Sequence, residues 1–200
     1  MRAYYDARAA EYDDWYLGTR LFASRDRPGW DAELAALTAA LASLPPARTL
    51  DVACGTAFLT RHLRGFVVGL DQSPNMVAIA QCRLPDGLAL VGDALRLPFA
   101  DGAFDRVFAG HFYGHLEAAE RPGFLSEARR VAPSLIVVDS AADAPREERQ
   151  ERRLNDGSRH RVYKRWFTAA SLAAELGGAT SVLHDGRWFV AVCAQFAASS

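Results

Sequence analysis

Carboxylates follow the short apolar runs of this chain at regular intervals, where they are suited to binding a nucleoside. Asp51 lies within one such run, Asp71 ends the next, and Asp93 follows the third. Asp71 comes twenty residues after Asp51, the distance expected across one strand–helix–strand step. A carboxylate after the second strand accepts hydroxyl protons of a ribose, and one after the third accepts a proton of an adenine amino group. The spacing therefore predicts a nucleoside site shared by consecutive strands.

Small residues surround the first of these carboxylates. Ala53, Gly55 and Ala57 allow the backbone to approach a ligand closely, and Cys54 lies among them. The fourth apolar run ends at Gly110. Because ligands of open α/β sheets bind beyond the carboxyl ends of the strands, these residues are expected to line one crevice.

The elements that position these residues alternate between strand and helix. Strands are predicted at 48–53, 66–70, 88–91, 104–109 and 134–139, and helices at 57–63, 74–83 and 116–131. Ser73 is the expected cap of the second helix, and Pro122 marks a possible later start of the third. Alternation predicts a parallel sheet with right-handed crossovers, and the continuous apolar runs predict burial on both faces.

The rest of the chain departs from this alternation. Helices are expected at 2–17, at 31–44 and, with Thr168 as cap, at 167–176. Residues 141–165 are expected to be a loop with a short helix at 145–154 and a turn at 155–157. Asp185-Gly186 separates two strand patterns, 180–184 and 187–195, and predicts a terminal hairpin.

Four segments together resemble the class I S-adenosylmethionine-dependent methyltransferases in order and spacing. They read LDVACGTAFLT, GLDQSPNMVAIA, GDALRLPFADGAFDRVFAGH and GRWFVAV. The resemblance covers roughly residues 4–192 and is weaker at 141–165. It implies an α/β fold: a single Rossmann-like domain whose mostly parallel seven-stranded sheet ends in an antiparallel hairpin, with helices on both faces. Its expected parts are an N-terminal helical preface (1–45), a cofactor-binding core (48–140), a lid (141–166) and a terminal helix and hairpin (167–195).

The resemblance also implies S-adenosylmethionine as cofactor and assigns residues to its methionine end. Gly55 lies under the methionine portion, within the loop that contains Ala53 and Cys54. Asp51 orients this loop and the cofactor's amino group. Tyr12, in the segment AEYDD, matches a family tyrosine that closes over the methionine portion, and Gly110 borders the same end.

At the nucleoside end, the resemblance assigns Asp71 to the ribose hydroxyls and Asp93 to the adenine amino group. The backbone of Ala94 contacts the ring edge, and Gln72 and Met76 flank the adenine.

The loop departs from the family at two positions that usually hold glycine, Ala53 and Ala57. A methyl group at Ala57 requires a negative φ or costs about 1 kcal/mol. The main rival with a similar fold is a nicotinamide dehydrogenase, whose fingerprint is G-x-G-x-x-G. The corresponding ACGTAF lacks the first and third glycines, which disfavours that rival.

The segment after the fourth strand is expected to face the transferred methyl group. His111 and His115 are candidates for a base or a substrate-orienting group, and Tyr113 is a further hydrogen-bonding candidate. The alternative is that the histidines cap the following helix or pack against the aromatic N-terminal preface.

Residues 146–164 hold seven Arg or Lys and four Asp or Glu. As a lid, this segment and its continuation would recognise an anionic or aromatic substrate through Arg161, Tyr163 or Trp166. The alternative is a solvated helix followed by an edge segment. If the chain is extended here, Arg161 and Tyr163 face away from Trp166, so these residues do not all reach the pocket.

The leading hypothesis is methylation of a small molecule on oxygen, nitrogen or carbon. The alternatives are an RNA methyltransferase of the tRNA type and a non-catalytic member of the fold. A formal net charge of −1 disfavours nucleic acid as partner. No signal-peptide run, membrane span or metal site is predicted, and the three separated cysteines fit a reducing cytoplasm. The sequence carries no signal for an oligomeric state.

Overall fold

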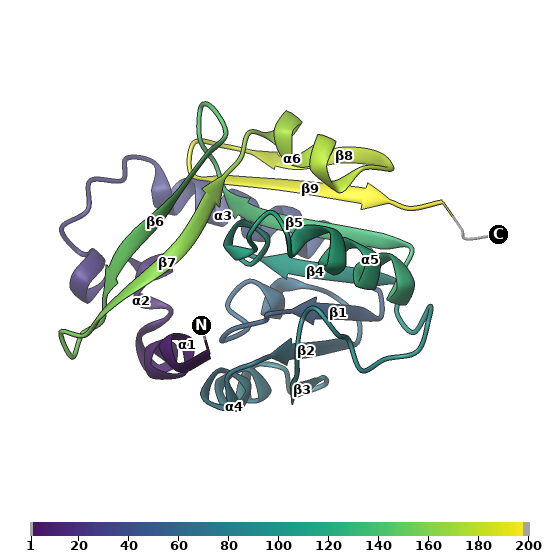
Figure 1. The fold of residues 1–200 in the computed structure, drawn as a ribbon, viewed down its shortest axis with the longest axis horizontal. Helices are drawn as coiled ribbons and strands as arrows, with labels where there is room; N and C mark the ends of the chain where they lie inside the picture. The colour runs from purple at the N-terminus through teal and green to yellow at the C-terminus, as the bar shows by residue number, and fades with distance from the viewer. Residues whose placement is uncertain (1, 198–200) are drawn as a thin grey trace.

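Seven strands form the central sheet of the computed structural model, which describes residues 2–197. Residues 1 and 198–200 of the predicted domain lie outside the described part. The strands are β1 (Thr49–Val52), β2 (Val67–Asp71), β3 (Leu88–Val91), β4 (Arg106–Gly110), β5 (Ser134–Ser140), β8 (Ala179–Asp185) and β9 (Phe189–Gln195). Their order is β3-β2-β1-β4-β5-β9-β8 (Figure 1). β1 to β5 are parallel, while β9 runs antiparallel to β5 and β8. The predicted fold class is confirmed.

The strand order reverses at β1, which pairs with β2 on one side and β4 on the other. The chain runs from β1 to β2 on one side and from β4 to β5 on the other. At such a switch point a crevice opens beyond the carboxyl ends of the strands, here β1 and β4. The predicted cofactor residues between Asp51 and Gly110 lie at the ends of β1, β2, β3 and β4 or in the segments that follow them, at this edge of the sheet.

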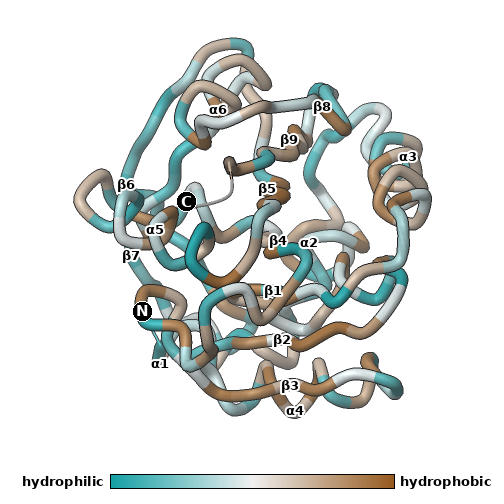
Figure 2. Tube along the Cα trace, turned by 90° about the vertical axis from the view of Figure 1, so that its right-hand side faces the viewer, coloured by the Kyte–Doolittle hydropathy of each residue, from teal (hydrophilic) through white to brown (hydrophobic). Residues whose placement is uncertain are grey.

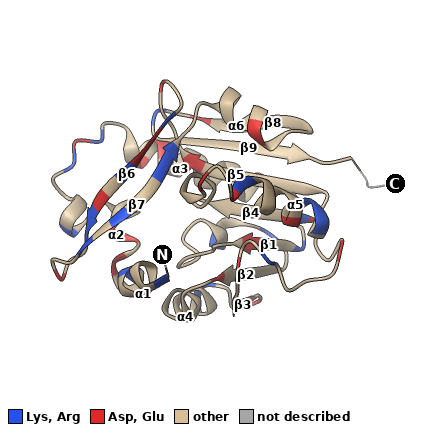
Figure 3. Cartoon of the chain, in the orientation of Figure 1, with Lys and Arg blue, Asp and Glu red and all other residues tan. Residues whose placement is uncertain are grey.

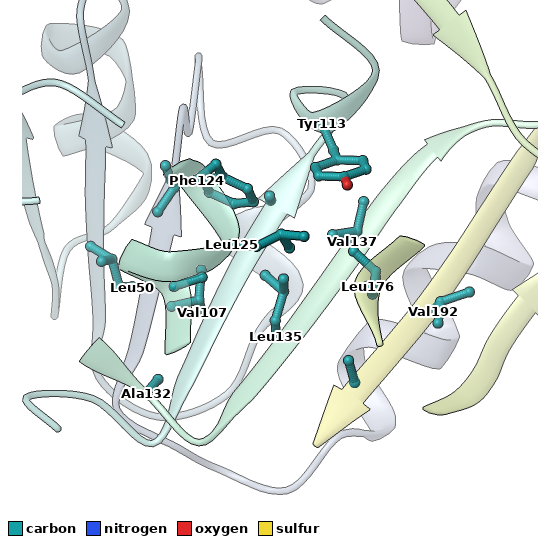
Figure 4. Close-up of a cluster of buried hydrophobic side chains, with 14 of the residues drawn as sticks. Leu50, Val107, Tyr113, Phe124, Leu125, Ala132, Leu135, Val137, Leu176 and Val192 are labelled. Carbon is teal, nitrogen blue, oxygen red and sulfur yellow. The ribbon is translucent and has the colours of Figure 1, made fainter. Parts of the chain in front are cut away.

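Helices cover both faces of the sheet. They are α1 (Arg2–Arg8), α2 (Asp14–Leu17), α3 (Trp30–Ser43), α4 (Pro74–Arg83), α5 (Arg121–Val131) and α6 (Ala169–Leu176), with 3-10 turns η1 (Ala9–Glu11), η2 (Arg20–Phe22), η3 (Thr60–His62) and η4 (Tyr113–His115). Figure 2 shows hydrophobic segments of β5 and β9 between α3 on one side and α5 and α6 on the other. In the core of the α5 and α6 face, Phe124 and Leu176 pack against strand residues such as Val107 (Figure 4). α3 and α4 pack on the opposite face.

Two helix starts follow their predicted caps. The Ser73 hydroxyl accepts a hydrogen bond from the backbone N–H of Met76 at 3.2 Å, and α4 has the predicted limits. Thr168 and Ser171 form a reciprocal capping box at the start of α6.

Three predictions about the core are wrong in detail. The helix expected at 57–63 is replaced by the short turn η3, because Ala57 has a left-handed φ of +58° that no α-helix accepts. The helix expected from 116 begins at Arg121, so the alternative, a later start marked by Pro122, is the correct one. The side chains of β3 are mostly exposed, because this strand lies at the edge of the sheet.

The segment between β5 and α6 forms a second, two-stranded sheet. β6 (Arg146–Arg153) pairs antiparallel with β7 (Arg159–Trp166) along its whole length. The helix predicted at 145–154 is therefore wrong. Its charged sequence offers no apolar stripe of helical period that could bury one face, whereas the ladder to β7 satisfies its backbone. The predicted turn at 155–157 joins the two strands, with Gly157 at a φ of +88°.

The N-terminal helices and this hairpin lie together beyond the carboxyl ends of the parallel strands (Figure 1). Tyr4 of α1 packs against Leu154 and Val162 of the hairpin. η1 and α1 also contact α4, the helix after β2. Across residues 2–197, every helix is too short or too polar to cross a membrane.

Candidate active site

The loop after β1 holds three residues in the left-handed backbone region. Ala53, Gly55 and Ala57 have φ values of +57°, +53° and +58°. Glycine adopts this region freely, while alanine does so at a cost of about 1–2 kcal/mol. Such strain clusters where a ligand dictates the backbone path. A Cβ atom on Gly55 would lie 3.4 Å from the ring of Tyr12, so Tyr12 lies over this loop.

Asp71 ends β2 and points into the crevice. Its two carboxylate oxygens accept hydrogen bonds from the backbone N–H groups of Gly55 and Ser73, both at 2.9 Å. The side chain is buried, which raises its pKa, while the two N–H donors oppose that rise. Each oxygen retains a lone pair, so the carboxylate can also accept the hydroxyl protons of a sugar.

Asp71 and Asp93 line one cavity of about 420 Å³. Asp93 follows β3, where its Oδ1 accepts a hydrogen bond from the backbone N–H of Leu95 at 2.9 Å. Eight of the predicted cofactor residues line this cavity: Tyr12, Ala53, Gly55, Asp71, Gln72, Met76, Asp93 and Ala94. The structure therefore brings both carboxylates that are predicted to bind the nucleoside to a common crevice.

The other predicted cofactor residues lie beside this cavity. Asp51, Cys54 and Gly110 border a space of about 10 Å³ that shares Tyr12 and Ala53 with it. The thiol of Cys54 packs over Gly69 of β2, so a contact of Cys54 to a ligand would come from its main chain.

Asp51 is a buried carboxyl group with an unpartnered oxygen. Its Oδ2 accepts a hydrogen bond from the Thr60 hydroxyl, whereas Oδ1 is buried and has no partner among the described residues. Burial raises the pKa of Asp51 to about 8. A cationic group of a ligand would supply the missing donor.

His111 begins the segment after β4 and is enclosed by aromatic rings. It has a φ of +54°, and its ring lies 4.8 Å from that of Trp15 and 5.7 Å from that of Phe189, measured between centroids. Burial lowers the pKa of His111 to about 3, so the imidazole is neutral near pH 7. Its buried Nε2 has no hydrogen-bond partner among the described residues.

His115 is held in one tautomer. Its Nδ1 lies 2.6 Å from the carbonyl oxygen of Tyr163, an acceptor, so Nδ1 carries the proton. Burial lowers the pKa of His115 well below its usual value. The imidazole is therefore neutral near pH 7, and Nε2 carries a free lone pair that can accept a hydrogen bond.

A buried ion pair fixes this region to the hairpin. The Lys164 ammonium of β7 contacts the Asp139 carboxylate of β5, and both side chains are almost fully buried. Asp139 also accepts a hydrogen bond from the backbone N–H of Gly114 at 2.7 Å. Although burial alone would raise it, the pKa of Asp139 is lowered by the charge of Lys164. The carboxylate thus positions the turn that contains His115.

A second, larger cavity of about 1090 Å³ lies between the N-terminal helices and the hairpin. It shares Tyr5, Tyr12, His111 and His115 with the smaller cavity. These four side chains mark the junction at which a group held in one cavity meets a molecule held in the other.

The comparison with known proteins agrees with this geometry. Residues 50–134 match a family described as a methyltransferase domain. The chain is 40% identical over 91 residues to a demethylmenaquinone methyltransferase of Thermotoga maritima, covering 43% of this chain and 39% of the relative. The chain is also 37% identical over 154 residues to the demethylmenaquinone methyltransferase of Parafrankia sp., covering 66% of this chain and 58% of that relative. The chain thus spans less than two thirds of the length of these curated relatives.

A solved structure, the DhpI-SAM-HEP complex, matches almost the whole fold. It superposes with a TM-score of 0.76 at 28% sequence identity, covering 96% of this chain and 94% of that one. The chain has the fold and the motifs of the class I S-adenosylmethionine-dependent methyltransferases. The family resemblance inferred from the four motifs is confirmed.

The structure separates the predicted substrate residues of this methyltransferase. Trp166 lines the larger cavity. Arg161 is exposed on the other face of the hairpin, where the hydroxyl of Tyr163 contacts Arg121 and Glu147. Tyr113 is buried and contacts Glu175. Tyr113, Arg161 and Tyr163 are absent from the lining of both the smaller and the larger cavity. The alternation of side chains along β7 turns Arg161 and Tyr163 outward, and α5 and α6 cover Tyr113.

Sequence reasoning missed several residues of the methyltransferase site. Tyr5, Arg8, Arg152 and Lys164 line the larger cavity, and Tyr5 lines both cavities. If residues 159–166 are interpreted as a strand, the alternation of side chains along it predicts that Lys164 and Trp166 lie on one face. Nothing in the local sequence predicts that α1 packs against a hairpin more than a hundred residues away.

Proposed function

We propose that this methyltransferase transfers a methyl group from S-adenosylmethionine to a small molecule held in the larger cavity. One observation carries the proposal. The cavity lined by Asp71 and Asp93 meets the larger cavity at His111 and His115. A cofactor and an acceptor bound on the two sides would face each other at that junction.

The residues present fit the cofactor. Asp71 would hold the ribose hydroxyls, Asp93 the adenine amino group, and Gln72 and Met76 would flank the ring. The unpartnered Oδ1 of Asp51 supports binding of the α-ammonium group at the methionine end. The DhpI structure is described as containing SAM, which supports the same cofactor here.

The bound sulfonium supplies a methyl group that is already activated for displacement. The chain's part is to position the acceptor and exclude water, which the aromatic rings around His111 support. Where the acceptor carries a proton, Nε2 of His115 would accept a hydrogen bond from it and so orient the attacking atom.

A small molecule is favoured over RNA by the charges of the hairpin's outer face. Arg159 and Arg165 pair there with Glu151 and Glu147. Curated relatives include demethylmenaquinone and ajmaline N-methyltransferases, both named for small molecules. The three cysteines are free, which supports the cytoplasmic location that we include in the proposal.

The experiment is release of S-adenosylhomocysteine by the purified chain with a panel of small-molecule acceptors. We expect turnover with at least one acceptor and a rate at least about a hundredfold lower in His115→Gln, with cofactor affinity unchanged. Cofactor binding without turnover on any acceptor would instead support the non-catalytic alternative. Turnover on tRNA that falls steeply with salt would support the RNA alternative.

A further inference from the structure

The larger cavity has a basic lining that the overall composition does not explain. Nine of its lining residues are Arg or Lys and three are Asp or Glu, although the whole chain has a formal net charge of −1. Figure 3 shows Lys and Arg along β6 and β7 and on α1, the elements that enclose this space. Some of these cations are already neutralised, Lys164 by Asp139 and Arg149 by Glu117.

Arg8 is a buried cation without a carboxylate. Only 7% of its surface is exposed, and its guanidinium donates to the Tyr4 hydroxyl. Among residues 2–197, no Asp or Glu forms an ion pair with it. Arginine keeps its charge at any physiological pH, and burying an unpaired charge is costly. An anion supplied from outside the chain would remove that cost.

Two further arginines lie near Arg8 and also lack a carboxylate partner within the described chain. The guanidinium carbons of Arg8 and Arg25 lie 5.9 Å and 4.7 Å from the centre of the Phe22 ring. The nearest side-chain partner of Arg152 is the amide of Gln150, at 3.5 Å. Positive charge on Arg152 and Arg8 adds to burial in lowering the pKa of Arg25. The three side chains thus repel one another across the cavity.

The cluster lies beside the junction between the two cavities. Arg8 is 5.3 Å from the centre of the Tyr12 ring, one of the shared residues. The charge of Arg152 also contributes to the low pKa of His111 and of His115. A molecule whose anionic group contacts these arginines would therefore have its body close to both histidines.

Aromatic side chains form the other part of the lining. All four tryptophans of the chain, Trp15, Trp30, Trp166 and Trp188, line this cavity. Such walls fit an apolar body attached to the anionic group. They also make tryptophan fluorescence a direct reporter of occupancy.

We propose that the acceptor is a small molecule with an apolar body and an oxyanion, a carboxylate or a phosphate, which Arg8, Arg25 and Arg152 bind. This inference rests on the proposed function, because it names the substrate class of the same site. Planar guanidinium groups suit both oxyanions, since each presents paired oxygens to their N–H groups.

The test is a titration monitored by tryptophan fluorescence at constant ionic strength, with S-adenosylhomocysteine present. Benzoate and phenyl phosphate serve as anionic probes, and benzamide as the neutral match. We expect saturable binding of an anion, at least tenfold tighter than that of benzamide. Arg152→Gln and Arg25→Gln should each weaken it at least tenfold, because each removes a charge-assisted hydrogen bond. The stronger of the two anions identifies the preferred oxyanion.

Arg64→Gln is the matched control, because Arg64 is exposed before β2, at the opposite end of the parallel strands. It should bind the anions as the wild type does. Benzamide binding as tightly as the anions, or wild-type anion affinity in Arg152→Gln, would overturn the proposal. Calorimetry with S-adenosylhomocysteine alone distinguishes failure of this inference from failure of the proposed function. Cofactor binding without anion binding rejects only this inference, whereas absent cofactor binding rejects the proposed function.

Discussion

At the scale of single residues, Asp51 shows how burial prepares a group for a ligand. Its carboxyl is almost fully buried, Oδ1 lacks a partner in the described chain, and its pKa is raised to about 8. The group is therefore mostly protonated at neutral pH. An ammonium group beside Oδ1 would favour the ionised form and release the proton.

We expect the affinity for S-adenosylmethionine to rise with pH, by up to about tenfold per unit below pH 8, and to level off above it. The affinity rises with pH because the ionised carboxylate of Asp51 is the form that binds the ammonium group. At lower pH a smaller fraction of Asp51 is ionised. Calorimetry between pH 6 and 8, in buffers of different ionisation enthalpy, would detect the released proton. Asp51→Asn should bind more weakly and show no such slope. A wild-type affinity independent of pH, without proton release, would exclude this role for Asp51.

The predicted residues that the structure brings together are those whose positions are set by the ends of neighbouring strands. Asp71 and Asp93 follow consecutive parallel strands, so the pairing of β2 with β3 brings them to one edge. Arg8 and Arg152 meet only because α1 packs on the hairpin, a contact of long sequence separation. Local pattern carries no information about such a contact, which explains why the core was predicted and the larger cavity was not.

At the scale of elements, the β6–β7 hairpin completes the site. Its first strand replaces the helix that the sequence predicts at 145–154, and alternate residues of the hairpin lie on two faces. Lys164 and Trp166 line the cavity, while the Tyr163 hydroxyl contacts Arg121 on the other face. The Asp139–Lys164 pair joins the hairpin to β5 in the main sheet. This pair is expected to fix the position of the hairpin over the junction.

Lys164→Met should lower the free energy of unfolding by about 3–5 kcal/mol, because it leaves the buried Asp139 carboxylate without its partner. The double variant Lys164→Met, Asp139→Asn should be more stable than Lys164→Met alone, since the uncompensated charge is gone. Urea denaturation measures all three proteins. Arg159→Met, which breaks an exposed pair on the same strand, should change stability by less than about 1 kcal/mol. Equal stability of Lys164→Met and wild type would mean that the pair does not anchor the hairpin.

At the scale of the whole molecule, three parts enclose the two cavities: the edge of the parallel sheet, the N-terminal helices and the hairpin (Figure 1). This enclosure buries titratable groups whose pKa values shift in opposite directions. The pKa values of His111 and His115 are lowered by burial, whereas those of Asp51 and Asp71 are raised by it. Their contributions to the pH dependence of stability oppose one another, so variants are needed to isolate each group.

His111→Asn isolates one of these groups and retains a residue type that tolerates the left-handed φ of this position. In the wild type, the unfolded state binds a proton at His111 below about pH 6.5, while the folded state does so only near pH 3. The stability of wild type relative to the variant should therefore fall by up to about 1.4 kcal/mol per pH unit as the pH drops from 6.5 to 5. Urea denaturation at several pH values measures the difference. A difference that stays constant over this window would show that His111 is not buried as a neutral group.

The most direct measurement is calorimetric titration of S-adenosylmethionine into wild type, Asp71→Asn and Asp93→Asn. Asp86→Asn, an exposed change before β3 and away from the crevice, serves as control. We expect saturable binding to wild type and control, and roughly tenfold to hundredfold weaker binding to each of the two crevice variants, because each loses charge-assisted hydrogen bonds. Absence of binding to wild type, or equal affinity in all four proteins, would contradict a nucleoside site at the ends of β2 and β3.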